Sequence, residues 1–282
     1  MWKKDIVSWK VHNVLCISIP FTWLVSKAEK LAYSHKGKVF VGGPGAILMK
    51  DTIDWAEVQE TTPYNVLAMH NPLAVFTTRG CPRKCPFCAV PILEPEYIEL
   101  DNWTPAPIVC DNNILACSNR HFKKVIDSLK CFDYVDFNQG LDCRLFSPWH
   151  ASLLQSLKGV KIRFAFDHVS MEKNVSDAIT LAKEKGFKDF GVYVLIGFKD
   201  TYEDALYRLE TVRKWGIRPN PMRYQPLDSV RKDSFLSKEG GWTEKRMKDV
   251  MRYYSRLIWL EQVPFEEYSI SKRNKSKGFG LL

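Results

Sequence analysis

Residues 76–88 read Phe-Thr-Thr-Arg-Gly-Cys-Pro-Arg-Lys-Cys-Pro-Phe-Cys, and this short stretch holds three of the eight cysteines in the chain. The spacing of these three is Cys81-x3-Cys85-x2-Cys88. Three thiolates on one loop can bind three irons of a cubane [4Fe–4S] cluster. The fourth iron then has no protein ligand, and an open metal position is typical of a catalytic site. The spacing therefore predicts an open iron–sulfur site.

Two other interpretations of the cysteine loop stay open at this point. A structural zinc site needs four ligands, and the nearest candidates for a fourth are His70 and Cys110. Three reduced cysteines in the protein core are the other alternative, which a loop rich in proline and arginine disfavours. Arg79, Arg83 and Lys84 can offset the negative charge of a cluster ligated by thiolates.

The sequence after residue 70 alternates between short β-branched or aromatic runs and amphipathic helical stretches. The predicted strands are Leu73–Thr78, Ile108–Ile114, Tyr134–Asn138, Lys161–Phe166, Gly191–Ile196 and Met222–Gln225. The predicted helices are His121–Lys130, Pro148–Leu157, Glu172–Lys185, Thr201–Trp215 and Thr243–Gln262. This order predicts an α/β fold with a parallel sheet that curls into a barrel or partial barrel. Chemistry is then expected at the C-terminal ends of the strands.

The remainder of the chain divides into two smaller parts in our interpretation. Residues 1–70 predict a small β-α-β unit, with strands Val14–Ile19 and Val39–Val41 on either side of a helix Thr22–His35. Such a unit is too small to be stable alone, so we expect it to pack on the barrel of residues 71–230. Residues 231–282 predict a C-terminal helix followed by the basic tail Lys272–Lys277.

The cysteine spacing, with aromatic Phe87 before the last cysteine, resembles the signature of the radical S-adenosylmethionine (SAM) superfamily. That signature follows the first strand of a partial (β/α)6 barrel, and the resemblance covers residues 71–230. It implies a [4Fe–4S] cluster that reductively cleaves SAM to a 5′-deoxyadenosyl radical, which abstracts hydrogen from a substrate. It also implies an electron donor such as flavodoxin or ferredoxin. The substrate, whether RNA, peptide or small molecule, is not defined, and no catalytic residue is assigned.

Six residues are candidates for the SAM site if the resemblance holds. In order, they are Phe87, Asp111, Asn113, Arg144, Asp167 and Gly197. The run around Asp111 and Asn113 is similar to the acidic, Asn-containing pattern of cobalamin-dependent and methylthiolating members, which implies binding of the SAM amino group. Arg144 suits a carboxylate of SAM or of the substrate, although a structural Arg–Asp pair is an equal alternative. Asp167 suits a ribose hydroxyl, and Gly197 permits close approach of adenine.

The N-terminal unit resembles the second half of a cobalamin-binding domain. The family's Asp-x-His-x-x-Gly motif is absent, because neither His12 nor His35 has the required neighbours. We therefore expect a truncated domain and no cobalamin. The Gly42-Gly43-Pro44-Gly45 turn could alternatively cradle a phosphate, although no Lys-Ser/Thr pair follows it.

The charge and the cysteine pattern bear on partners and compartment. The net charge of +9 permits a nucleic-acid partner, and a zinc-dependent nucleic-acid-binding module without catalysis is the rival hypothesis. Clustered cysteines indicate a reducing compartment. The apolar run Leu15–Val25 is interrupted by Pro20 and too short to span a bilayer. We therefore expect a cytoplasmic protein with no membrane partner.

Overall fold

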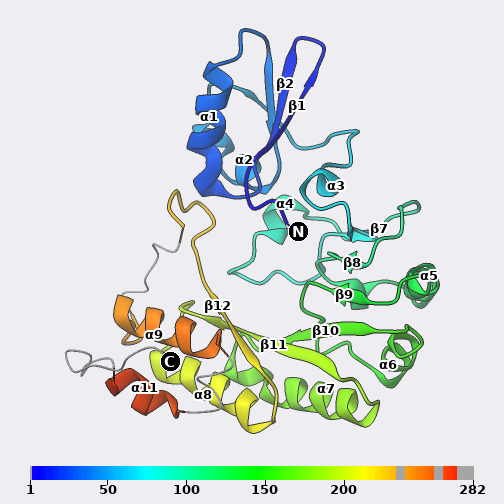
Figure 1. Cartoon of the computed structure of the whole chain (residues 1–282), viewed down its shortest axis with the longest axis vertical. Helices are drawn as coiled ribbons and strands as arrows, with labels where there is room; N and C mark the ends of the chain where they lie inside the picture. The colour runs from blue at the N-terminus through cyan, green and yellow to red at the C-terminus, as the bar shows by residue number, and fades with distance from the viewer. Residues whose placement is uncertain (1, 233–238, 257–262, 272–282) are drawn as a thin grey trace, which may run out of the picture.

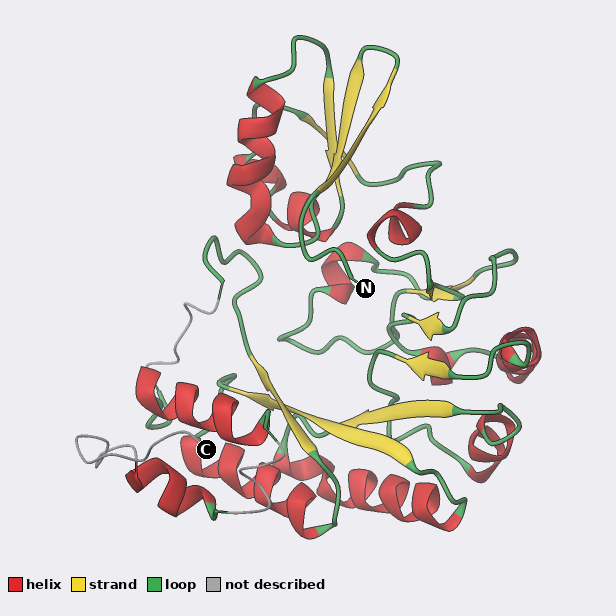
Figure 2. Ribbon diagram, in the orientation of Figure 1, coloured by secondary structure: helices red, strands yellow, loops and turns green. Residues whose placement is uncertain are grey.

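The computed structural model describes residues 2–232, 239–256 and 263–271. Figures 1 and 2 show two bodies of secondary structure, a small N-terminal sheet with its helices and a larger sheet flanked by helices. The described residues form a four-stranded sheet, a six-stranded sheet and a two-stranded ribbon. The N-terminal sheet packs above the larger one in the orientation of Figure 1.

The six-stranded sheet confirms the predicted α/β partial barrel. Its strands are β5 (Ala74–Val75), β8 (Ile108–Val109), β9 (Val135–Phe137), β10 (Val160–Ala165), β11 (Asp189–Ile196) and β12 (Pro219–Arg223). Each strand pairs in parallel with the next one in this series. Within the described residues β5 and β12 remain the two edges, so the sheet is an open barrel.

Helices cover one face of this sheet, as Figure 2 shows. They are α5 (Asn119–Leu129), α6 (Pro148–Leu154), α7 (Glu172–Glu184), α8 (Tyr202–Lys214), α9 (Glu244–Tyr254) and α11 (Phe265–Ser271). Their apolar sides form one core with the sheet, in which Phe122, Phe137 and Phe164 are fully buried. Each such ring contributes about 2–3 kcal/mol when removed from water. Thr201 begins α8 with a capping box that includes Asp204, the helix start expected from the sequence.

The N-terminal unit has two more strands than the sequence predicted. Its sheet contains β1 (Val7–Val11), β2 (Val14–Ser18), β3 (Val39–Gly42) and β4 (Glu57–Gln59), with β1 antiparallel to β2 and the others parallel. The helices are α1 (Val25–Tyr33), preceded by a 3-10 turn at Thr22–Leu24, and α2 (Pro44–Leu48). The outer strands escaped prediction because β1 is only half-buried and β4 is three residues long.

The N-terminal sheet and its helices make contacts near both edges of the open barrel. Near β5, Ser18 Oγ lies 2.9 Å from Nε2 of His70, which ends α3 (Val66–His70). On the same side α2 lies against α4 (Val90–Leu93), which follows the cysteine loop. Near β12, Thr22 Oγ1 donates to Ser229 O at 2.5 Å. The N-terminal sheet and its helices therefore contact segments that flank both edge strands.

Several predicted boundaries differ from the structure. Strands β5 and β8 are two residues each, because the chain after them leaves the sheet to make the loops described below. Strand β12 begins at Pro219, before the predicted start at Met222. Residues 257–262 of the predicted last helix and the basic tail lie outside the described residues. None of the helices in the described ranges is long and apolar enough to cross a bilayer.

Candidate active site

The cysteine loop begins on a buried carboxylate. Asp111, just after β8, accepts hydrogen bonds from Thr77 N at 2.6 Å, Thr77 Oγ1 at 2.5 Å and Thr78 N at 2.8 Å. Burial raises the pKa of Asp111, and the hydrogen bonds from Thr77 and Thr78 oppose that rise. The carboxylate thus ties the end of β5 to the end of β8, where the loop leaves the sheet.

A second carboxylate holds the loop from its other side. Glu94, at the end of α4, accepts hydrogen bonds from Gly80 N at 2.6 Å and Asn112 Nδ2 at 2.9 Å, and it pairs with Arg79. Gly80 has a φ of 74°, and a Cβ there would lie 2.0 Å from Glu96 O. Only glycine fits this turn, which lies between the ribbon strand β6 (Thr78–Arg79) and Cys81.

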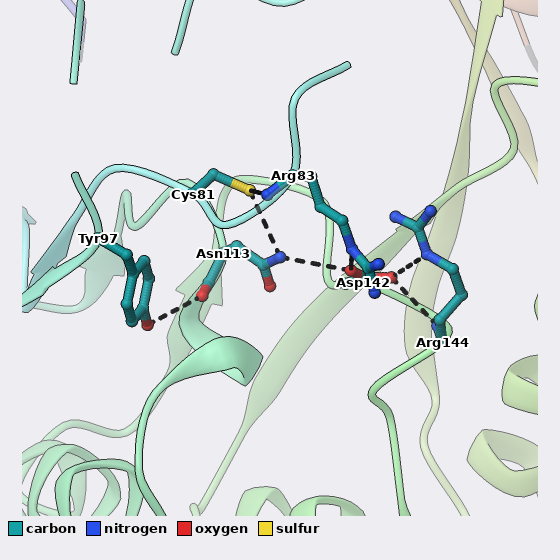
Figure 3. A network of polar contacts seen from close by, with 6 residues as sticks. All are labelled: Cys81, Arg83, Tyr97, Asn113, Asp142 and Arg144. Atoms are coloured by element: carbon teal, nitrogen blue, oxygen red, sulfur yellow. Dashed lines mark hydrogen bonds and ion pairs between the residues drawn. The ribbon is translucent and has the colours of Figure 1, made fainter. Parts of the chain in front are cut away.

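A third carboxylate joins the loop to the next strand end, as Figure 3 shows. Asp142, after β9, accepts from Arg83 Nε at 2.9 Å and from Arg144 Nε at 2.6 Å. Asn113 Nδ2 lies 3.3 Å from the same carboxylate. Figure 3 also shows the two terminal nitrogens of Arg144 pointing away from Asp142. These two terminal nitrogens of Arg144 can therefore donate hydrogen bonds to another partner.

The cysteine sulfurs accept N–H hydrogen bonds of the kind that stabilise thiolates. Cys81 Sγ lies 3.4 Å from Arg83 N and 3.5 Å from Asn113 Nδ2. Cys88 Sγ lies 3.5 Å from Val90 N. Burial raises the pKa of Cys85 and of Cys88, with smaller effects of the neighbouring cysteines and of Asp167. Three thiols on one short loop, with N–H donors beside two of them, suit a group that takes one thiolate on each of three irons.

Both residues considered as a fourth zinc ligand are occupied elsewhere. The two ring nitrogens of His70 contact Ser18 Oγ and Lys3 O, at 2.9 and 3.2 Å. The Cys110 thiol donates to Ile108 O, and burial raises its pKa to about 12. Across the described parts of the chain, no three histidine, cysteine or acidic side chains are gathered so that they could hold a single metal ion.

Aromatic rings connect the cysteine loop to the ends of the last two strands. The ring of Phe87 packs edge-on against Phe198 with centroids 5.5 Å apart, and Phe198 packs against Tyr224 at 4.7 Å. Gly197 precedes Phe198 with a φ of 84°, and its N–H donates to Asp200 Oδ1 at 2.9 Å. The left-handed turn at Gly197 directs Phe198 toward the loop.

The chain matches no protein-family model and no curated protein. Among solved structures it is similar to the radical S-adenosylmethionine methyltransferase TsrM from Kitasatospora setae, with cobalamin and a [4Fe–4S] cluster bound. The TM-score is 0.55 at 11% sequence identity. The chain shares the fold of this radical SAM enzyme. The match covers 78% of this chain and 66% of the TsrM chain, slightly less than two thirds of that protein.

The fold gathers most of the predicted SAM-site residues around the cysteine loop. Asn113 contacts Cys81, and the charges of Arg144 and Asp167 both act on Cys85. Burial raises the pKa of Asp167 to about 6, against the opposing charges of Arg208 and Arg144. Their roles in binding SAM stay predictions.

Asp111 is the predicted residue whose surroundings differ most from the expectation. Its carboxylate oxygens face Thr77 and Thr78, so they hold the loop rather than lying free for an ammonium group. For Arg144, the structure contains the Arg–Asp pair that was one of two alternatives: its Nε and its backbone N–H donate to Asp142 Oδ1, and its two terminal nitrogens point away (Figure 3).

Three residues of the site were not assigned from the sequence. Asp142 and Glu94 hold the loop, and Arg208 holds the ends of two strands. Arg208 Nη1 donates to Phe166 O at 3.0 Å and to Leu195 O at 2.6 Å. A signal for Arg208 exists in the sequence, because it falls within the helical stripe formed by Ala205, Leu209 and Val212.

The glycine-rich turn of the N-terminal unit serves internal packing. A Cβ on Gly43 would lie 2.9 Å from Ile19 O, and one on Gly45 would lie 2.6 Å from Phe21 O. The turn therefore lets α2 approach the end of β2 closely, and nothing in it favours the phosphate cradle. The cobalamin in the similar structure is bound to TsrM and does not test this chain. That this chain binds no cobalamin therefore stays a prediction.

Proposed function

We propose that this protein is a radical SAM enzyme in which Cys81, Cys85 and Cys88 hold a [4Fe–4S] cluster. When bound, such a cluster supplies the electron that cleaves SAM to methionine and a 5′-deoxyadenosyl radical. The observation that carries the proposal is the cysteine loop itself. Three carboxylates hold it at the strand ends of an open barrel, and N–H donors face two of its sulfurs.

Polar groups beside the loop suit the amino-acid part of SAM. Asn113 Oδ1 is buried and has no hydrogen-bond partner among the described residues, so it can accept a hydrogen bond from an ammonium group. The terminal nitrogens of Arg144 face away from Asp142 and can bind a carboxylate. An ammonium and a carboxylate on one carbon are the groups by which SAM would approach an open iron.

The ends of the later strands suit the nucleoside part of SAM. Asp167 follows β10 and can accept a hydrogen bond from a ribose hydroxyl. Gly197, Phe198 and Phe87 offer a turn and aromatic surface for adenine. The N-terminal unit, which makes contacts near both edges of the barrel, would restrict the access of water to this end.

Partners follow from the chemistry and the charge. The cluster would need a one-electron donor such as flavodoxin or ferredoxin, in keeping with a cytoplasmic protein. The net charge of +9 favours an acidic donor or substrate, and nucleic acid stays open as a substrate class. The rival zinc module is weakened because His70 and Cys110 are engaged elsewhere.

The test is anaerobic reconstitution of the full chain with iron and sulfide, followed by reduction and addition of SAM. Wild-type protein should bind about four irons per chain and release 5′-deoxyadenosine, measured by chromatography. Cys85→Ala should lose both properties. Cys110→Ala removes a thiol outside the loop and is the matched control, which should keep its iron. Stoichiometric zinc in place of iron and sulfide would reject the proposal.

A further inference from the structure

Asp142 accepts four hydrogen bonds from described residues at the site, two of them from Arg144, and no role in the predicted SAM site was assigned to it. Its side chain is 4% exposed. Its partners come from three segments: Arg83 lies in the cysteine loop, Asn113 follows β8, and Arg144 is two residues further along the chain (Figure 3). One carboxylate therefore joins the loop to two neighbouring strand ends.

The charges around Asp142 keep it ionised. Burial would raise the pKa of this carboxyl, but hydrogen bonds from Arg144 and Arg83 outweigh burial and hold its pKa below the usual value. A buried ion pair of this kind contributes little net stability, because desolvation offsets the attraction. Such a pair does restrict the geometry of its partners, and here one partner belongs to the cysteine loop.

The two N–H donors to Cys81 both depend on Asp142. Arg83 donates its backbone N–H to Cys81 Sγ and its Nε–H to Asp142 Oδ2. Asn113 Nδ2 lies between the same two acceptors, at 3.5 Å from the sulfur and 3.3 Å from Asp142 Oδ2. If the Asn113 amide rotated by 180°, its oxygen would face both a carboxylate and a sulfur. The negative charge of Asp142 disfavours that rotation.

We propose that Asp142 is a positioning residue for Cys81, because it holds Arg83 in place and fixes the amide orientation of Asn113. This inference rests on the proposed function, since it concerns the ligand environment of the cluster. The same orientation leaves Asn113 Oδ1 facing away from Asp142 and free of partners among the described residues. Asp142 thus acts on the site through two neighbours and touches no reacting atom itself.

The test compares Asp142→Asn with the matched control Asp136→Asn. Asp136 is half-buried and pairs with Arg163 in the same barrel. The control therefore also removes a carboxylate from an Asp–Arg pair, but at a distance from the cysteine loop in sequence. Reconstituted proteins are mixed anaerobically with an iron chelator, and the rate of iron release is followed by absorbance. Asp142→Asn should release iron about 10-fold faster than wild type, because loss of a group that orients the surroundings of a metal ligand typically weakens metal binding by about 10-fold or more. Asp136→Asn should match wild type.

A spectroscopic readout separates positioning from general loosening of the fold. The electron paramagnetic resonance spectrum of the reduced cluster should change in Asp142→Asn and be unchanged in Asp136→Asn. Asp142→Glu should restore part of the wild-type release rate, because it keeps the charge. If Asp142→Asn does not fold, Arg83→Met is tested in its place. Arg83 is 37% exposed, so its replacement leaves less of a gap in the core than that of Asp142. Arg83→Met should also release iron faster than wild type.

The outcomes distinguish the two levels of the proposal. A wild-type protein that takes up no iron and sulfide would reject the proposed function. A wild-type protein that forms the cluster, beside Asp142→Asn and Arg83→Met variants with unchanged release rate and spectrum, would reject the role of Asp142 alone.

Discussion

The Asp111 carboxylate accepts two hydrogen bonds from Thr77, one from its backbone nitrogen and one from its hydroxyl, across 34 positions of sequence. This contact lies where β5 and β8 both end, so it fixes where the cysteine loop begins. The residue expected from the sequence to bind the amino group of SAM therefore has its carboxylate committed to the loop.

The first prediction concerns this contact. Asp111→Asn should lower the free energy of unfolding of the cluster-free protein by about 1–3 kcal/mol, because the asparagine side chain has one acceptor oxygen for three buried donors. Thr77→Val removes only the hydroxyl and should cost about 1 kcal/mol. Urea denaturation measures both. If Asp111→Asn unfolded like wild type but no longer bound SAM, Asp111 would contact SAM as the sequence suggested.

The sequence allowed the fold to be predicted because its local signals agree. Apolar strands alternate with amphipathic helices after residue 70, and this alternation favours a parallel sheet covered by helices. The cysteine loop was recognisable because its spacing is local. The contacts of Asp111 and Asp142 could not be predicted in this way, because a carboxylate at a strand end has several neighbours and its choice depends on how the loop crosses above it.

A second prediction concerns the turn before Cys81. Gly80→Ala should destabilise the protein by more than about 2 kcal/mol, because its φ is positive and its Cβ would overlap Glu96 O. Gly186→Ala is the control, with a φ of 76° but no atom within 4 Å of the added Cβ. It should cost about 1 kcal/mol, the conformational penalty alone. Equal melting temperatures for the two variants would show that the overlap is relieved by movement of the loop.

Iron loading distinguishes the same two glycines. At equal concentrations of folded protein, Gly80→Ala should bind less iron than wild type. The reason is that the hydrogen bond from Gly80 N to Glu94 holds the loop in the shape that binds the cluster. Gly186 follows α7 and lies far from the cysteine loop in sequence, so Gly186→Ala should bind as much iron as wild type.

A third prediction concerns the buried arginine under the strand ends. Arg208 is 1% exposed and pairs with Asp200 while binding the carbonyls of Phe166 and Leu195. Arg208→Met should cost about 3–5 kcal/mol, because it leaves Asp200 and two carbonyl groups without their partner. Lys158→Met removes an exposed ion pair with Asp133 and should have no measurable effect on unfolding. A small effect of Arg208→Met would mean that water replaces the guanidinium.

Burial of Arg208 shows where sequence reasoning can improve. The residue lies in register with Ala205, Leu209 and Val212 on the apolar side of α8. An arginine within an apolar helical stripe has to find acceptors in the core, and here the acceptors are strand-end carbonyls. By contrast, Glu94 gave no such signal, because its role depends on the path of the loop between Cys88 and the end of α4.

The last prediction concerns Asp167, whose pKa burial raises from 3.8 to about 6. A raised pKa means that the folded protein holds the proton more tightly than the unfolded chain, so wild-type stability falls as pH rises from about 4 to about 6. The groups that act on it are Arg208 and Arg144, which lower its pKa, and the Cys85 and Cys88 thiols, whose pKa values are themselves raised.

Asp167→Asn should therefore stabilise the reduced, cluster-free protein at pH 7 and leave it unchanged near pH 4. The pKa difference corresponds to about 3 kcal/mol, and partial exposure of the side chain reduces the expected gain to about 1–2 kcal/mol. Urea denaturation between pH 4 and 8 measures it. Asp127→Asn is the control, since the pKa of exposed Asp127 is lowered by Lys123 and Lys130 and its loss should change stability in the opposite sense. A gain that did not vary with pH would show that the carboxylate of Asp167 is not the cause.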